Sequence, residues 1–447
     1  EGLSYYKPPA DSPEIKYIKK CRKKLGGPLP SRRVNGDKLT IPALSVFDRL
    51  LNETGDREIS TTQALVQAMT LLCKDKNIGQ RVVPIVPDEA RTFGMEGMFR
   101  QIGIYAHEGQ KYEPVDREQL MYYKENQSGQ MLQEGITEDG AMSSWIAAAT
   151  SYSNSGMQMI PFYMFYSMFG FQRIGDLIWA AGDMQARGFL IGATSGRTTL
   201  NGEGLQHEDG HSQIMAGNVP NCISYDPTFS YELMVIMHDA MTRMFKKQEN
   251  VFYYITTMNE NYSHPCLPSG QEKNIIKGMY LLQKGKKGKV RVQLLGSGTI
   301  LRESIAAAEL LSEDFNVQAD IWSCPSFNQL KRDGDDVFRW NLLHPDKKPR
   351  KCHITQCLES SNGPVVAATD YVKLFADQIR AYVPKSYTVL GTDGYGRSDS
   401  REALRKHFEV DRYYIALAAL SALCAEGSVS AKTANSAIKK YGIDTDK

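Results

Sequence analysis

The sequence predicts an α/β protein built from two mostly parallel sheets, each covered by helices. Short apolar runs typical of buried strands recur along the chain, and segments with apolar residues at helical spacing separate them. Strands that alternate with helices form parallel sheets with both faces covered. The 447 residues also exceed the size of one hydrophobic core, which favours two or three domains.

Residues 1–37 are rich in Pro, Lys and Arg, which predicts an extended arm or linker. Residues 38–267 are expected to form the first domain. Ser60 and the two threonines after it precede a stretch with helical apolar spacing, as expected of a capped helix. Further helices are expected at 140–149 and 231–246, and strands at 81–86, 159–165, 187–192 and 251–258.

Residues 268–447 are expected to form a second domain with the same alternation. The composition changes between 266 and 288, where Pro268, Gly270 and a basic tract mark the boundary. Strands are expected at 290–295, 317–322 and 387–391, and helices around 306–311, 371–379 and 413–424. The Gly296-Ser297-Gly298 turn lacks the third glycine of a dinucleotide fingerprint, so a tight turn is the simpler interpretation.

Composition and charge narrow the class of protein. Lys plus Arg number 53 and Asp plus Glu 51, and a net charge of +2 argues against a nucleic-acid partner. The sequence has no run of about 18 apolar residues, so no membrane-spanning helix is expected. Eight scattered cysteines without a CxxC pair indicate thiols of a reducing compartment, and we expect a cytoplasmic location.

The segment at 201–211 is dense in titratable groups. His207 and His211 are four residues apart, as two zinc ligands on one helix would be, but the glycines around them disfavour a helix. No metal site is therefore predicted. A loop histidine that follows a strand is either a surface residue or a catalytic group, and the sequence alone leaves both open.

Two more segments carry groups with a possible chemical role. Glu134, Glu138 and Asp139 precede the predicted helix at 140–149. Acids are favourable at a helix N-terminus, so a structural role is the simpler interpretation and acid–base chemistry is the alternative. Six aromatic residues lie within 161–173, and most of them are expected in the core. Because strand side chains alternate, one or two could form a stacking wall for a planar ring.

Five motifs together resemble one protein family, and they occur in that family's order. The resemblance extends over nearly the whole chain from about Leu39. The motifs are DEARTFGM at 88–95, GITE at 135–138, FGFQRIGD at 169–176, GLQHEDGH at 204–211 and GTDGYGRSD at 391–399. The family they resemble is the thiamine diphosphate-dependent decarboxylating component of the bacterial pyruvate dehydrogenase complex, of the homodimeric, transketolase-like type.

The resemblance implies that this chain holds two of three domains, the aminopyrimidine-binding domain and the carboxy-terminal domain. The family's Gly-Asp-Gly diphosphate motif is absent, because Gly36-Asp37 lacks the second glycine and Gly334-Asp335 continues with Asp336. We therefore expect the Mg²⁺ ligands to lie outside this chain. The first residue is Glu1 rather than Met, and we expect that the native start is missing.

The resemblance also implies a role for named residues. Glu138 would hydrogen-bond the cofactor's aminopyrimidine ring and activate it, and His207 and Glu89 would be the other catalytic residues. The substrate pocket is assigned to Tyr166, His207 and Glu89. The residues assigned to cofactor binding besides Glu138 are Phe169, Ile136, Asp88 and Arg173. Residues 107–120 would form a mobile loop over the site.

The activity implied is oxidative decarboxylation of pyruvate, with transfer of the acetyl unit to a lipoyl group. The partners implied are the diphosphate-binding domain, a homodimer partner and the dihydrolipoyl acyltransferase; neither a nucleic acid nor a membrane is expected. Two alternatives stay open. The chain could be a non-catalytic fragment that folds and oligomerises without binding the cofactor, or another transketolase-like 2-oxo acid enzyme.

Overall fold

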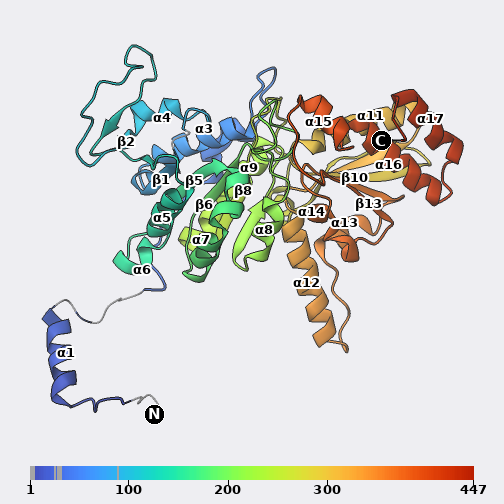
Figure 1. Ribbon diagram of the computed structural model, residues 1–447. Coiled ribbons are helices and arrows are strands. Elements are labelled where there is room, and N and C mark those ends of the chain that lie inside the picture. The colour runs from blue at the N-terminus through green and yellow to red at the C-terminus, as the bar shows by residue number, and fades with distance from the viewer. Residues whose placement is uncertain (1–5, 25–26, 28–32, 88–89, 447) are drawn as a thin grey trace.

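Two sheets, each flanked by helices, form the body of the molecule (Figure 1). The structure is a computed structural model that describes residues 6–24, 27, 33–87 and 90–446. The first sheet has six strands and the second has five, and a third pairing joins two short segments. The predicted α/β class with two mostly parallel sheets is therefore confirmed.

The first sheet is entirely parallel, in the order β4-β1-β5-β6-β8-β7. Its strands are β1 Val82–Val86, β4 Leu132–Gln133, β5 Ile160–Tyr166, β6 Phe189–Ala193, β7 Cys222–Tyr225 and β8 Phe252–Thr256. Four of these match predicted strands. β4 and β7 were missed, because they have only two and four residues and carry no clear period.

Helices cover both faces of the first sheet. On one face lie α3 Thr61–Cys73 and α9 Ser230–Met241, and on the other lie α5 Glu138–Ala149 and α7 Phe171–Asp183. Helix α3 is capped as predicted by Ser60, whose Oγ accepts a hydrogen bond from the Gln63 backbone N–H at 3.1 Å. The short helices of this part are α2 Asp48–Leu51, α4 Glu96–Gln101, α6 Ser151–Ser155 and α8 Ser212–Asn218.

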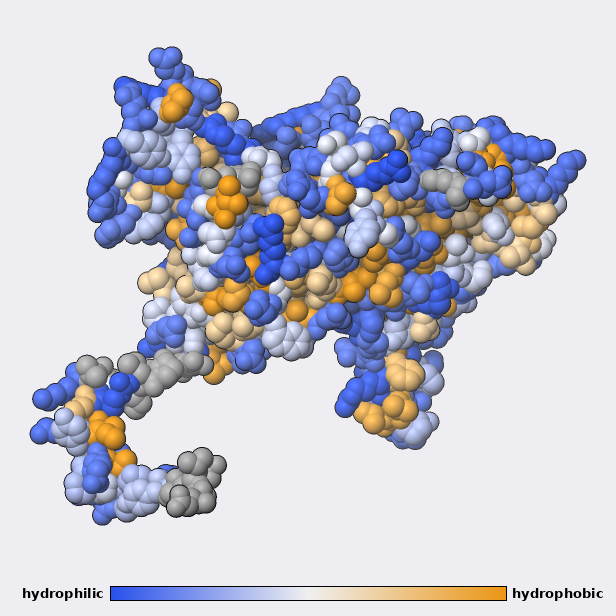
Figure 2. All heavy atoms as spheres, viewed as in Figure 1, coloured by the Kyte–Doolittle hydropathy of each residue, from blue (hydrophilic) through white to orange (hydrophobic). Residues whose placement is uncertain are grey.

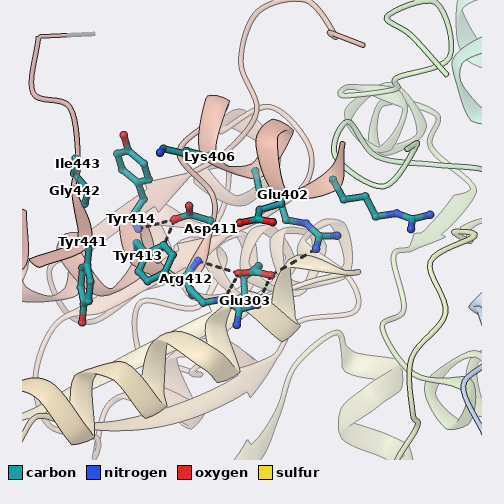
Figure 3. Close-up of a pocket in the computed structure, with 12 residues that line it drawn as sticks. Glu303, Glu402, Lys406, Asp411, Arg412, Tyr413, Tyr414, Tyr441, Gly442 and Ile443 are labelled. Carbon is teal, nitrogen blue, oxygen red and sulfur yellow. Dashed lines mark hydrogen bonds and ion pairs between the residues drawn. The ribbon is translucent and has the colours of Figure 1, made fainter. Parts of the chain in front are cut away.

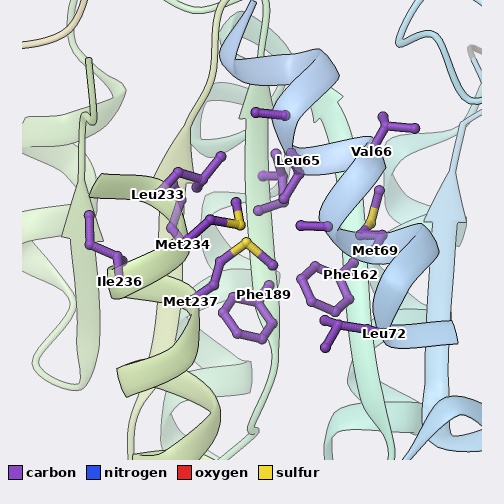
Figure 4. Packing of buried hydrophobic residues seen from close by; sticks show 14 of the residues in the cluster. Leu65, Val66, Met69, Leu72, Phe162, Phe189, Leu233, Met234, Ile236 and Met237 are labelled. Atoms are coloured by element: carbon purple, nitrogen blue, oxygen red, sulfur yellow. The ribbon is translucent and has the colours of Figure 1, made fainter. Parts of the chain in front are cut away.

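The core between the sheet and α3 and α9 is dense in aromatic and thioether side chains (Figure 4). The rings of Phe162 on β5 and Phe189 on β6 stack with centroids 4.4 Å apart and planes 5° apart. Met69, Met234 and Met237 are fully buried against them. Flexible thioethers fill the space around such rigid rings well. These contacts fix the strands whose ends form the site described below.

The second sheet has the order β13-β12-β10-β11-β9, with β9 antiparallel to β11. Its strands are β9 Tyr280–Gln283, β10 Arg291–Gly296, β11 Gln318–Ser323, β12 Val365–Ala368 and β13 Tyr387–Leu390. Helices α11 Ile300–Phe315 and α16 Arg412–Ala425 pack on one face, and α12 Phe327–Leu343 and α13 His353–Leu358 on the other. The remaining helices are α10 Glu272–Lys277, α14 Leu374–Asp377, α15 Arg401–His407 and α17 Ala431–Tyr441.

One local expectation differs from the structure. The helix predicted over 371–379 is reduced to the four residues of α14, because the backbone before it turns to meet neighbouring loops. Helix α12 is longer than the sheet it covers, and its carboxyl end projects from the body (Figure 1). Phe338 and Leu342 near that end are exposed, so apolar side chains stand at the tip (Figure 2). Among the described helices, none is both long and apolar enough to cross a bilayer.

The amino-terminal arm stands apart from the body and contains a helix rather than only extended chain (Figure 1). Helix α1 Pro13–Lys24 has no buried residue. The chain joins the body at 33–37, where Gly36 N–H donates to Gln248 Oε1 at 2.9 Å and Arg33 N–H donates to the Ser153 carbonyl at 2.9 Å. A pair of two-residue strands, β2 Ile104–Tyr105 and β3 Glu125–Asn126, closes a loop at the far edge of the first sheet.

Candidate active site

Side chains from four separate segments meet at the carboxyl ends of β5 and β6. In parallel α/β sheets this edge is where ligands bind. Tyr166 is the last residue of β5, and Phe169 lies in the short helical turn that follows it. Glu138 is the first residue of α5, and Arg173 lies in the first turn of α7. His207 comes from the loop after β6.

Three rings form the wall of this site. The centroids of Tyr166 and His207 are 4.9 Å apart, and those of Phe169 and His207 are 5.3 Å apart. Tyr166 and Phe169 meet edge to face at 6.0 Å. Phe93, which the sequence did not single out as a site residue, packs against Tyr166 from behind at 5.5 Å. The two predicted aromatic residues therefore contact the predicted histidine, as a stacking wall requires.

Glu138 combines the two interpretations that the sequence left open. It lies at a helix N-terminus, where Thr137 caps α5 by accepting the Gly140 N–H at 3.2 Å. Its carboxylate is also part of the cluster, since Glu138 Oε2 accepts from Arg173 Nη1 at 3.0 Å. The Arg173 guanidinium lies 4.0 Å from the Phe169 ring centroid. A planar ligand therefore takes the other face of Phe169 or displaces the guanidinium.

The two histidines of the 201–211 loop have different surroundings. His207 Nδ1 is buried without a hydrogen-bond partner, and the Glu203 carboxylate lies 3.6 Å away. His211 instead has its Nε2 2.7 Å from the Gln172 side-chain nitrogen, just before α8 begins at Ser212. Within the described ranges, no three His, Cys, Asp or Glu side chains are grouped as metal ligands would be.

Glu208, next to His207 in sequence, is a buried acid that sequence reasoning did not single out. Only 1% of the residue is exposed, and its Oε2 accepts from the Arg397 backbone N–H at 2.6 Å. Burial raises the pKa of Glu208 to about 7, although the Arg397 hydrogen bond and the Arg197 guanidinium lower it. The density of charges in this loop was visible in the sequence, but the burial of one of them was not.

Three of the predicted site residues are not placed in this cluster. Asp88 and Glu89 lie outside the described residues. Ile136 is 80% exposed, on the approach to α5. For these residues the assignment stays a prediction.

A polar cavity of about 490 Å³ lies among the helices over the second sheet (Figure 3). Its lining residues are far in sequence from those of the Glu138 cluster. Its lining residues come from position 303 and from 401–443. Glu303 accepts from Arg412 Nε at 2.9 Å and from Nη2 at 3.0 Å, so these charges neutralise each other. The cavity and the Glu138 cluster therefore share none of their residues.

The fold is that of transketolase-like proteins. The solved structure of transketolase from Leishmania mexicana matches with a TM-score of 0.63 at 14% identity, covering 86% of this chain and 48% of that one. A structure titled "Split gene transketolase, inactive beta4 tetramer" matches with a TM-score of 0.53 at 14% identity, covering 82% of this chain and 99% of that one. These likenesses establish the fold class.

Comparison with family models is more specific. Residues 40–265 match the family described as pyruvate dehydrogenase E1 component middle domain, and residues 278–411 match the transketolase-like TK C-terminal domain. The chain belongs to the pyruvate dehydrogenase E1 component family, which confirms the resemblance found in the motifs.

Relatives named pyruvate dehydrogenase E1 component are similar over the whole chain. The protein of Cupriavidus necator is 60% identical over 450 residues, and that of Escherichia coli K12 is 58% identical over 450 residues. Both alignments cover 100% of this chain but 50% of the relative. The chain therefore spans about half the length of the curated relatives that it matches.

Proposed function

We propose that this chain supplies the aminopyrimidine half of a thiamine diphosphate-dependent site that decarboxylates pyruvate and passes the acetyl unit to a lipoyl group. The observation that carries the proposal is the convergence of Glu138, Phe169, Tyr166 and His207 at one sheet edge, in a member of this family. These residues are separated by up to 69 positions in sequence, so only a folded site brings them together.

The residues present fit the chemistry of an aminopyrimidine ring. The ring would need a carboxyl group at one edge and an aromatic face beneath it, and Glu138 and Phe169 offer both. Glu138 has a side chain that is 13% exposed, so its carboxyl would hold a proton at a ring nitrogen away from bulk water. When bound, thiamine diphosphate supplies the electron sink that decarboxylation of a 2-oxo acid requires.

The other residues would act on the substrate side. The His207 side chain is 19% exposed, so its imidazole would exchange a proton with a ligand oxygen, while Glu203 lies 3.6 Å from its buried Nδ1. Tyr166 and Phe169 would exclude water from that exchange. Arg173 would hold the Glu138 carboxylate in position through its 3.0 Å contact. Asp88 would bind the cofactor, and Glu89 would act in catalysis and line the substrate pocket.

The proposal includes a division of the chain and a set of partners. Residues 38–267 would bind the aminopyrimidine and 268–447 would be the carboxy-terminal domain; the strands of the two sheets lie within 82–256 and 280–390. The diphosphate and its Mg²⁺ would be held by a domain outside this chain. A second copy and a lipoyl-bearing acyltransferase would complete the assembly. A cytoplasmic location is supported by eight free cysteine thiols.

Titration of thiamine diphosphate with Mg²⁺ tests the proposal. The chain is titrated alone and together with the portion of the Escherichia coli relative that it does not match. We expect binding only in the second case. Binding in neither case would refute the proposed half-site, and tight binding to the chain alone would contradict a diphosphate site elsewhere.

The Glu138→Ala variant, mixed with the supplied portion of the Escherichia coli relative, tests the proposed role of Glu138 in activating the cofactor. We expect exchange of the cofactor's C2 proton, followed by NMR, to slow at least 100-fold while the thermal midpoint stays within a few degrees. Asp139→Ala is the matched control, since Asp139 is exposed beside Glu138 on the same helix turn. Unchanged exchange in Glu138→Ala would remove Glu138 from the mechanism.

The non-catalytic module is the second candidate. The half-length structure titled as an inactive β4 tetramer supports it, because a chain of this fold and extent then exists as an oligomer without activity. A homogeneous oligomer that binds no cofactor even with the supplied domain would favour this candidate.

A further inference from the structure

The loop that carries His207 is held along its length by the second half of the chain. Hydrogen bonds spaced along the segment 194–211, which follows β6, join it to residues 370–405. Their donor and acceptor pairs include Thr198 N–H to Asp370 Oδ1 at 3.1 Å, Arg401 Nε to the Thr199 carbonyl at 2.7 Å, Gly202 N–H to the Asp399 carbonyl at 3.0 Å and Val372 N–H to the Gly210 carbonyl at 2.8 Å.

Glu208 makes the contact beside His207 in sequence. Its Oε2 accepts from Arg397 N–H at 2.6 Å, within the loop 391–399 that follows β13. Its Oε1 is buried and has no hydrogen-bond partner. The residue is 1% exposed, so its carboxyl faces the second half of the chain rather than solvent. Because the carboxyl is buried, loss of the hydrogen bond from Arg397 N–H to Oε2 would be costly. This cost ties the position of Glu208 to the 391–399 loop.

Side chains of the 194–211 segment pack too closely on Gly396 and Gly210 to leave room for a Cβ at either glycine. A Cβ at Gly396 would lie 2.6 Å from Glu208 Oε2 and 2.7 Å from Glu208 Cβ. A Cβ at Gly210 would lie 2.3 Å from Arg197 Nε. Arg197 is itself buried and donates to the carbonyls of Thr392 and Gly394 in the same loop. Glycine at these contacts therefore permits the close packing.

We infer that Glu208 is a positioning residue through which the carboxy-terminal domain fixes His207 in the site. The inference rests on the proposed function for the role of His207, but the contact itself does not depend on it. Glu208 hydrogen-bonds a backbone N–H of the 391–399 loop, whereas its sequence neighbour His207 packs on Tyr166 and Phe169. The 391–399 loop thereby positions a site residue through a backbone N–H, without placing a side chain of its own in the site.

The position of His207 can be measured on this chain without cofactor or activity. The imidazole signals of His207 are recorded by NMR and assigned by their loss in His207→Gln. In Glu208→Ala we expect these signals to shift and broaden, because the acceptor for Arg397 N–H is lost. In Glu208→Gln the amide oxygen still accepts that bond, so the signals should stay near their wild-type positions.

Glu232→Gln is the matched control. Glu232 is also fully buried and links the first half to the second, since it accepts from Tyr280 at 2.7 Å and Ser323 at 2.6 Å, but its contacts lie away from the loop. It should lower the thermal midpoint and leave the His207 signals unmoved. If Glu208→Ala does not fold, Gly396→Ala displaces the Glu208 carboxyl instead and should move the same signals.

Kinetics with the supplied diphosphate-binding domain provide the second readout. We expect Glu208→Ala to lower kcat for pyruvate at least tenfold with KM within twofold, and Glu208→Gln to restore most of that loss. Unmoved His207 signals in a folded Glu208→Ala chain, or equal movement in Glu208→Gln, would overturn the inference. A wild-type mixture without activity would refute the proposed function alone, since the NMR comparison still decides the role of Glu208.

Discussion

Removal of the charge on one partly buried carboxylate between the two halves of the chain should destabilise the protein by a calculable amount. Glu260 follows β8 and binds residues from two helices over the second sheet. Its Oε1 accepts from Arg302 Nη1 at 2.7 Å, and its Oε2 accepts from Thr299 Oγ1 at 2.8 Å. Arg405 of α15 forms a second ion pair with the same carboxylate. Glu260→Gln removes the charge and keeps the shape.

The magnitude follows from the pKa of Glu260. Burial alone would raise it, but Arg405 and Arg302 outweigh burial and lower the pKa from 4.5 to about 2. Because one pKa unit corresponds to about 1.4 kcal/mol, the charged form contributes about 3 kcal/mol to the free energy of unfolding. A lowered carboxyl pKa stabilises the folded state fully above pH 4.5, and this stability is lost as the pH falls toward 2.

Urea unfolding followed by far-UV circular dichroism tests this value. At pH 7 the free energy of unfolding of Glu260→Gln should be about 3 kcal/mol below wild type, and the difference should shrink on acidification below pH 4.5. Asp346→Asn is the control, because the Asp346 side chain is 70% exposed beside Lys347 and its loss should cost no more than about 0.5 kcal/mol. Equal losses in both variants, or a gap that does not change with pH, would refute the reasoning.

Two further predictions concern the core and the buried acids. Phe162→Ala should lower the free energy of unfolding by about 3 to 5 kcal/mol, because the ring stacks on Phe189 with centroids 4.4 Å apart in the core. Phe162→Leu should lower it clearly less. Similar urea midpoints for the two variants would contradict the close packing. Burial raises the pKa of Asp226 from 3.8 to about 6, so the folded state holds the proton more tightly and the contribution of Asp226 to stability should fall as the pH rises from about 4 to 6. Asp226→Asn should flatten that part of the pH profile of the urea midpoint, and an unchanged slope would show that Asp226 is not its source.

Local patterns predicted most of the regular structure. The helix capped by Ser60 was visible from its helical apolar spacing, and the strands that became β1, β5, β6 and β8 were visible as short apolar runs. The antiparallel β9 and the short β7 were not, because pairing with a neighbour rather than their own residues defines them. Helix α1 was likewise missed within an arm whose composition suggested only extended chain.

The site was predicted only in part. The motifs indicated Glu138, Phe169 and His207, and the structure brings these residues together. The contact of Arg173 with both Glu138 and Phe169 depends on the packing of α5 against α7, which no local pattern encodes. Glu208 appeared in the sequence as one acid among several in a polar loop.

The sequence by itself determined the α/β class, the family and the residue types available for chemistry. These follow from local spacing and from short motifs in a fixed order, which need no knowledge of long-range contacts. Only the tertiary structure decided which acids are buried and which loop holds His207. The Arg397 N–H that meets Glu208 lies 189 positions away, and the pKa of Glu208 depends on the atoms that exclude water from it. Burial is a property of the folded surroundings, so it cannot be read from a residue and its neighbours in sequence.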